Sequence, residues 1–358
     1  MKFSNLIYLC IILLIGITSC SEDDPKPKPN SNVVIVDYNI LEAAVWDADS
    51  IYYVQSTIKI DAILTIEAGT IIKFKADAGL EVWENGTINA TGSRDLPILF
   101  TSYKDDFGGD TNGDLVATSP NSGDWNLIDL DDQNGSQFMY CIFTYGGNDN
   151  YSGVLDLGSN YSKVEYCIFA NNSTYVHGDV YYGALAAQDA KNTTIITNNT
   201  FYNNTVPLSI NGHLSIDNSN IFSNPDDATQ TNTYNGIFVH GQDIISHSTT
   251  WQETELAYVI QYDGFEIWDT YSLTLGDNVV LKFMTDAMFD IQVGAELINH
   301  DGTGVYFTSF KDDANKGDTN GDGAATTPSA TEWKGVYNNL PTNYFYTWSN
   351  ILYSKNDY

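Results

Sequence analysis

The sequence predicts an all-β solenoid, and three observations support this fold class. Short runs rich in Val, Ile, Phe and Thr, such as residues 33–36, 71–74 and 194–196, are separated by Asn, Gly and Asp, which is typical of strands joined by turns. Similar runs recur about every 20 to 30 residues. After the N-terminal apolar segment, no stretch combines a helical period with capping residues. Strands at this spacing, each unable to bury a face alone, are expected to stack into a coil.

The first segment of the chain is a targeting signal. Residues 6–17 are apolar and follow Lys2, and this run is too short to span a bilayer but has the length of a secretory signal core. It ends in Ile17-Thr18-Ser19-Cys20, which resembles the bacterial lipobox. The resemblance implies that residues 1–20 are a lipoprotein signal peptide and that Cys20 carries the lipid chains that anchor the protein to a membrane. The alternative is an ordinary secretory signal with an incidental Cys.

The next segment, residues 21–32, reads as a tether. Acidic residues 22–24 are followed by a Pro/Lys-rich stretch, which favours an extended, semi-rigid spacer. The acidic cluster resembles the export signal of surface-exposed lipoproteins of the Bacteroidota type. That resemblance implies an outer-membrane protein, lipid-anchored and displayed on the cell surface, whereas the alternative is a merely solvated tether.

The remainder of the chain contains one module twice. The expected boundaries are residues 33–250 for the first copy and residues 251–358 for a second, partial copy that stops soon after Trp333. The offset between the copies stays near 208 residues (318 − 110 = 208). Matching segments are residues 64–66 and 273–275, residues 72–74 and 281–283, residues 100–106 and 307–313, residues 109–114 and 317–322, and Trp125 and Trp333.

A shorter period lies within the first copy. One three-residue pattern ends in Phe143, Phe169, Phe201 and Phe222 and begins with Cys141, Cys167, Asn199 and Asn220. If equivalent positions stack on successive turns, the Phe residues form an internal column and the Cys and Asn residues a second column. Asn350 and Leu352 are expected to extend the two columns near the end of the chain. Two buried thiols are favoured over a Cys141–Cys167 disulfide, because parallel stacked side chains strain the disulfide torsion.

Two stretches carry a resemblance to a known family. Residues 193–204, TTIITNNTFYNN, and residues 63–74, ILTIEAGTIIKF, resemble repeats of the right-handed parallel β-helix of the pectin-lyase-like kind. The resemblance implies an all-β, right-handed parallel β-helix solenoid, here with acidic loop excursions. It leaves function open, because this fold hosts lyases, hydrolases, adhesins and surface proteins without known activity.

Composition excludes several classes of partner. Asp and Glu number 46 against 15 Lys and Arg, and the net charge of −31 disfavours nucleic acid and polyuronate substrates. Arg94 is the sole arginine, and the motifs of pectate lyases and polygalacturonases are missing. His177 and His240 lie in turn-like fragments. No catalytic residue is therefore predicted, although 46 acids offer many accidental carboxylate pairs.

The clearest chemical motif is an acidic loop that occurs in both copies. Asp110, Asn112 and Asp114 recur as Asp318, Asn320 and Asp322, an alternation of oxygen ligands typical of calcium loops. Asp124 and Glu332, or the acidic pairs 105–106 and 312–313, are available to complete a shell. The alternative is a polar turn that needs no ion. The second site is expected to be tighter, because Gly323 permits a turn that Leu115 resists.

Two functions remain open at this point. The first is a surface-displayed lipoprotein that binds a glycan or a protein ligand, in adhesion, without catalysis. The second is a carbohydrate-active enzyme, a lyase or hydrolase acting on a neutral glycan. Carboxylates with raised pKa beside aromatic platforms would favour the second.

Overall fold

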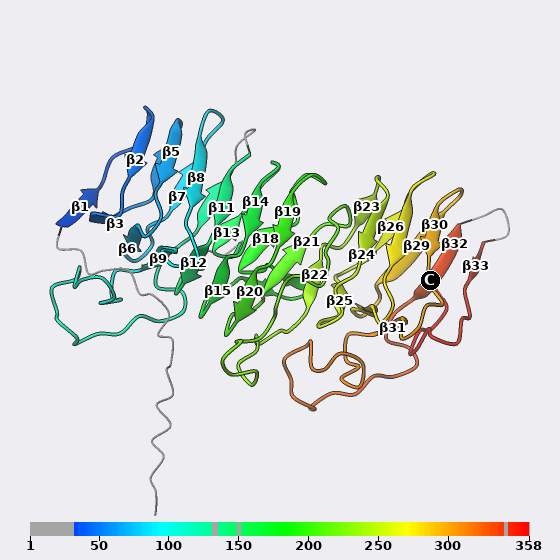
Figure 1. Ribbon diagram of the computed structural model, residues 1–358. Coiled ribbons are helices and arrows are strands. Elements are labelled where there is room, and N and C mark those ends of the chain that lie inside the picture. Colours follow the sequence, from blue (N-terminus) through cyan, green and yellow to red (C-terminus); the bar gives the residue numbers. More distant parts are fainter. Residues whose placement is uncertain (1–31, 131–134, 149–151, 340–342, 358) are drawn as a thin grey trace, which may run out of the picture.

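The computed structural model describes residues 32–130, 135–148, 152–339 and 343–357. Cys20 and most of the expected tether lie outside these residues. Over the described ranges the chain winds into an elongated right-handed parallel β-helix (Figure 1). These ranges contain no helix, and thus no helix able to cross a membrane.

Three sheets form the faces of the first half of the coil. Sheet A, seven-stranded, contains β1 (Asn32–Val36), β3 (Ser50–Val54), β6 (Ile71–Phe74), β9 (Ile98–Ser102), β12 (Cys141–Thr144), β15 (Ile168–Ala170) and β20 (Thr200–Tyr202). Sheet C, six-stranded, contains β2 (Ala44–Trp46), β5 (Ile63–Ile66), β8 (Thr87–Thr91), β11 (Gln137–Met139), β14 (Lys163–Glu165) and β19 (Ile195–Thr197).

Sheet B, ten-stranded, is continuous through both copies. It contains β4 (Ile58–Ile60), β7 (Leu80–Val82), β10 (Ile128–Leu130), β13 (Leu155–Asp156), β18 (Leu185–Ala187), β21 (Leu208–Ile210), β22 (Ile237–Val239), β25 (Tyr258–Ile260), β28 (Val280–Phe283) and β31 (Tyr306–Ser309). A short antiparallel hairpin, β16 (Val176–His177) and β17 (Val180–Tyr181), lies outside the coil.

Two further sheets complete the second half. Sheet D contains β23 (Asp243–Ile245), β26 (Gly264–Ile267), β29 (Met288–Gln292), β32 (Gly335–Asn339) and the antiparallel β33 (Tyr344–Phe345). Sheet E contains β24 (Thr249–Trp251), β27 (Ser272–Leu275) and β30 (Glu296–Ile298). The repeated strands therefore change sheet: β6 and β9 belong to sheet A, but their equivalents β28 and β31 belong to sheet B. The second copy is rotated by one face around the coil.

An aromatic column runs through the centre of the first half. Phe143, Phe169, Phe201 and Phe222 are fully buried, and their rings stack at centroid distances of 4.8, 5.0 and 5.2 Å. Phe100 of β9 begins the column, 4.8 Å from Phe143. The column exists because neighbouring parallel strands pair these residues directly, one turn after another.

The Cys and Asn column lies two residues earlier in the chain. Asn199 accepts from the Cys167 N–H at 2.9 Å and donates to Asn220 at 3.1 Å, while its amide also reaches the Val164 carbonyl at 2.9 Å. Cys141 and Cys167 are buried free thiols, and burial raises the pKa of the Cys141 thiol well above its usual range. These amides satisfy backbone groups at a corner that water does not reach.

A second Asn ladder, absent from the sequence-based prediction, closes the opposite end of the same strands. Asn172 donates to Asn204 at 2.9 Å, and Asn204 donates to Asn232 at 2.9 Å. Each amide also caps a carbonyl of the aromatic column, as Asn172 does for Phe143 at 2.9 Å. The aromatic column is therefore held between two amide ladders.

The repeat relation continues past Trp333 to near the end of the described chain. Trp333 stacks on Phe283 at 4.0 Å and donates to the Leu352 carbonyl, as Trp125 stacks on Phe74 at 4.3 Å and donates to Thr144. Phe307 pairs with Ile351, as its equivalent Phe100 pairs with Phe143. Ile351, not Leu352, therefore occupies the column position, and the expected register of Asn350 is off by one residue.

Removing a ring from the column should lower the stability of the coil. Phe169→Ala and Phe201→Ala are each expected to lower the free energy of unfolding by about 3–5 kcal/mol, because a fully buried ring leaves a cavity between two stacked neighbours. Urea denaturation measures this loss, with Tyr38→Ala, whose side chain is 56% exposed, as the control. A loss below about 1 kcal/mol for both Phe variants would contradict the column.

Candidate functional site

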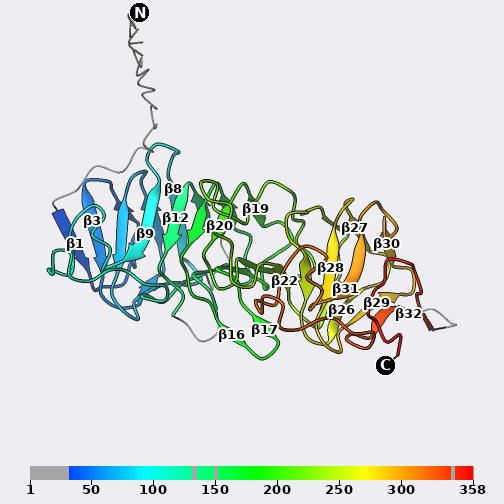
Figure 2. The same cartoon turned by 90° about the horizontal axis from the view of Figure 1, so that it is seen from below.

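Two long acidic loops leave the coil at equivalent points. Residues 103–127 follow β9, residues 310–334 follow β31, and both loops lie on the same side of the coil (Figures 1 and 2). Phe107 of the first loop packs on an apolar cluster on the outer face of sheet A that includes Ile51 and Ile71. Phe310 of the second loop packs beside Phe238 on sheet B. Each loop is thus anchored on the outer face of a sheet.

A buried lysine from the strand beneath enters each loop. The Lys73 ammonium donates to the Asp105 and Gly109 carbonyls, and the Lys282 ammonium donates to the Gly317 carbonyl at 2.6 Å and to Thr319 Oγ1 at 3.0 Å. Neither lysine side chain is exposed to solvent. Burial lowers the pKa of Lys282 to about 8, and the nearby Asp312, Asp313 and Asp318 oppose this shift. The sequence signal for this role is a lysine inside an apolar strand in both copies.

The repeated acidic turn is closed by its own side chains. Asp110 accepts from the Gly113 N–H at 2.7 Å and the Leu115 N–H at 2.9 Å, and the Leu115 bond is the main cause of the lowered pKa of Asp110. Asp318 accepts from the Gly323 N–H at 2.7 Å in the same way. Leu115 adopts φ +65° and Gly323 φ +74°, so Leu115 makes the same left-handed turn. For a residue with a Cβ, this conformation costs about 1–2 kcal/mol.

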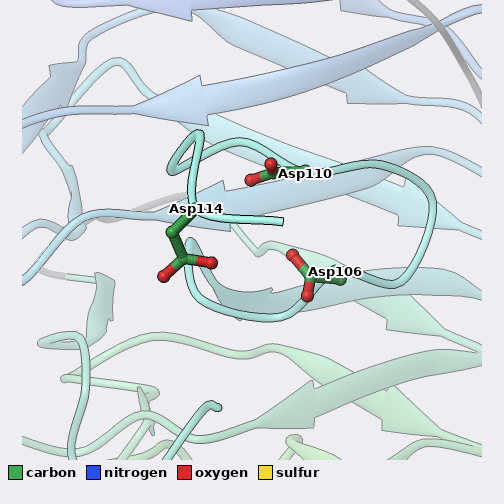
Figure 3. A group of neighbouring side chains, drawn as sticks. All are labelled: Asp106, Asp110 and Asp114. Carbon is green, nitrogen blue, oxygen red and sulfur yellow. The ribbon is translucent and has the colours of Figure 1, made fainter. Parts of the chain in front are cut away.

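Within the first loop three carboxylates face one another. Oxygens of Asp106, Asp110 and Asp114 lie within 4.8 Å of each other (Figure 3). The Oδ1 atom of Asp106 is buried and has no hydrogen-bond partner among the described residues. Asn112, in contrast, turns its amide nitrogen to Asp114 at 3.0 Å. Asp106 is therefore the carboxylate best placed to join the two predicted ones.

The second loop repeats this arrangement in a looser form. Asp313, the equivalent of Asp106, also has a buried Oδ1 atom without a partner in the described chain. Burial raises the pKa of Asp313, and the charges of Asp318 and Asp322 raise it further. Among the described residues, only the first-loop triad brings three such oxygens within 4.8 Å. Asn320 donates to Asp322 at 2.9 Å, as Asn112 does to Asp114.

The other acids near the loops are engaged elsewhere. Asp124 pairs with Lys104 at 2.7 Å, and Glu332 pairs with Lys311 at 3.0 Å. Asp105 accepts from Thr101 Oγ1 at 2.8 Å. These contacts fasten the loops to the coil, so Asp124, Glu332 and Asp105 hold structural positions in this geometry.

A separate polar hollow lies toward the end of the first copy. Its volume is about 340 Å³, and it is lined by Gln188, Asp189, Ala190, Lys191, Asn192, Asn211, His213 and His247. Asn211 is held by bonds to the Ala190 carbonyl at 2.7 Å and from the His213 N–H at 2.9 Å. The ring of His247 faces His213 edge-on at 5.5 Å and stacks against Tyr271 at 6.0 Å. Fixed amides beside rings suit a ligand rich in hydroxyl groups.

The residues considered for catalysis do not come together. Arg94 is exposed on a turn, His177 is exposed on the outer hairpin, and His240 bonds with the Tyr262 hydroxyl at 3.0 Å. Burial raises the pKa of Glu253 to about 7, but this side chain is only 1% exposed and accepts from two backbone N–H groups. A substrate has no access to it.

The comparisons with known proteins agree with this architecture. Residues 38–184 match the family model described as a pectate-lyase like beta helix domain. No curated protein and no solved structure matches the chain. The chain is thus a right-handed parallel β-helix protein whose residues 38–184 match the pectate-lyase-like β-helix family.

Proposed function

We propose that the protein is a surface-displayed lipoprotein whose β-helix binds a neutral glycan without converting it. The observation that carries this proposal is the polar hollow toward the end of the first copy, in which amide and imidazole groups are held by the coil. The separated positions of Arg94, His240 and Glu253 support binding over catalysis. The enzyme alternative rests instead on Asp290, whose pKa is raised to about 6 by burial and by the opposite Glu266, with the exposed Trp268 two residues after Glu266 in the chain. Repeat proteins commonly bind ligands on the extended surface of the solenoid.

The glycan proposal is tested by incubation with a panel of neutral and uronic-acid oligosaccharides, with retention and product formation scored together. We expect retention of a neutral glycan, no cleavage product, and weaker retention for His247→Ala, because this change removes one wall of the hollow. His177→Ala, on the outer hairpin, is the matched control. Cleavage of a glycan by the parent protein would favour a hydrolase or lyase instead. If no glycan is retained, the glycan proposal is wrong and adhesion to a protein ligand is the remaining function.

We also propose that Cys20 carries the lipid anchor and that residues 22–24 direct the protein to the outer surface. Cys20→Ser is expected to leave an unlipidated precursor that does not fractionate with membranes. Replacing residues 22–24 by Ala tests display separately, through protease accessibility on intact cells. Normal processing and membrane partitioning of Cys20→Ser would refute the anchor.

A further part of the proposal is that calcium orders the acidic loops. Asp106, Asp110 and Asp114 carry three negative charges, and the Lys73 ammonium inside the loop carries one positive charge, so a divalent ion would balance the cluster. A partnerless buried carboxylate oxygen at the same position in both loops supports an oxygen-binding cation there. Asp110, Asn112 and Asp114, or Asp318, Asn320 and Asp322, are the ligands expected from the sequence. Asp106 and Asp313, which the sequence offered among several acids that could complete the shell, join them.

Calcium at millimolar concentration is expected to raise the thermal midpoint of the parent protein relative to chelator, because an ion that binds only the folded loop stabilises it. Asp106→Asn and Asp313→Asn should each reduce the increase, and the double variant should remove it. Asp95→Asn, on the turn beside Arg94, serves as the control. If calcium does not change the thermal midpoint of the parent protein, both loops are polar turns that bind no ion. Comparing the single variants ranks the two sites, and Leu115→Gly tests whether strain weakens the first.

A further inference from the structure

The outer face of sheet D presents an uncommon pair of acids. Glu266 of β26 lies directly opposite Asp290 of β29, because the parallel register pairs these two residues. Gln292 donates to both carboxylates, at 2.6 Å to Glu266 and 3.1 Å to Asp290. Trp268 follows two residues after Glu266, and its side chain is 50% exposed. We call Glu266, Trp268, Asp290 and Gln292 the Trp268 face.

The first copy supplies an internal comparison. Its strands β4 and β7 are the equivalents of β26 and β29, since they surround the repeated β5 and β6 as β26 and β29 surround β27 and β28. In the first copy Lys59 stands opposite Glu81, where the second copy has Glu266 opposite Asp290. The Lys59 ammonium lies over the Trp83 ring, 3.7 Å from its centroid. The first copy therefore contains its own cation beside an acid and a tryptophan.

The second copy lacks that cation. Like charges directly opposite on neighbouring strands destabilise a sheet, whereas Lys opposite Glu stabilises it. Burial and the Glu266 charge together raise the pKa of Asp290 to about 6. Its Oδ1 atom is buried and has no partner in the described chain, and no cation or aromatic ring among the described residues stacks on Trp268. Asp290 thus carries a negative charge above about pH 6 directly opposite Glu266, and the exposed indole of Trp268 follows two residues after Glu266 in the chain.

We propose that the Trp268 face binds the alkylammonium group of a lysine on a partner protein, in the role that Lys59 has within the first copy. Two carboxylates attract the charge, and the indole face of Trp268 adds a cation–π contact. The net charge of −31 favours a basic partner and disfavours an anionic one. This site is distinct from the polar hollow and does not depend on glycan binding.

The test uses the full mature chain and a fluorescein-labelled lysine-rich peptide, with the same peptide acetylated at every lysine as the probe control. Fluorescence anisotropy at about 0.15 M salt limits non-specific attraction. The parent should bind the lysine peptide and not the acetylated one. Trp268→Ala should weaken binding about two- to fivefold, the size of an exposed cation–π contact. Trp83→Ala, whose ring is already occupied by Lys59, should leave binding unchanged.

A second variant makes the test independent of any loss of folding. Glu266→Lys restores the lysine–acid pair of the first copy, so it should raise the thermal midpoint and abolish peptide binding. Glu296→Lys on β30, an exposed position with the same charge change, should retain binding. Equal affinity for both peptides, equal losses for the two tryptophan variants, or unchanged binding by Glu266→Lys would each overturn the proposal. Retention of glycans is unaffected by any of these outcomes, so the proposed glycan function is judged separately.

Discussion

The parallel register, which places every side chain about 4.8 Å from its equivalent one turn away, is the constraint on which this structure depends. At that distance a ring stacks on a ring and an amide bonds to an amide, whereas like charges repel. Phe143 and Phe169 satisfy the constraint with rings 4.8 Å apart, and Asn199 satisfies it by donating to Asn220. The interior rows of the first half are accordingly aromatic and amide, and the acidic motifs leave the coil in loops.

The acidic loops are joined to this constraint through one side chain each. An ammonium buried without acceptors would cost several kcal/mol, so Lys73 and Lys282 require loop oxygens close by. The loops require the lysines in turn, because the carbonyls of Asp105, Gly109 and Gly317 would otherwise lack these donors. A change in the strand would therefore alter the loop above it, even though the two are far apart in sequence.

Most of the fold could be predicted from the sequence, because a pattern repeated at each turn indicates which residues stack. The ladder of Asn172, Asn204 and Asn232 is not evident from the sequence. Asn172 and Asn204 each follow a Phe of the column by three residues, but a longer loop places Asn232 outside that spacing. The change of sheet between copies could not be predicted, since a strand alternates inward and outward residues in the same way in any sheet. The place of Asp106 in the acidic triad depends on how its loop folds back, which spacing does not encode.

Comparing the two copies within one chain distinguishes interactions that the coil requires for stacking from features that it does not require. Where both copies keep an interaction, stacking explains it: Tyr52 stacks on Trp46 at 4.7 Å, and Tyr258 stacks on Trp251 at 4.5 Å, at equivalent turns. Where equivalent backbone positions differ in charge, as Lys59 and Glu266 do, stacking cannot be the reason, because the coil accepts both. The first arrangement is neutralised within the chain and the second is not. Within the described residues the charge of Glu266 and Asp290 has no balancing cation, and this is the charge that the proposed lysine ligand would neutralise.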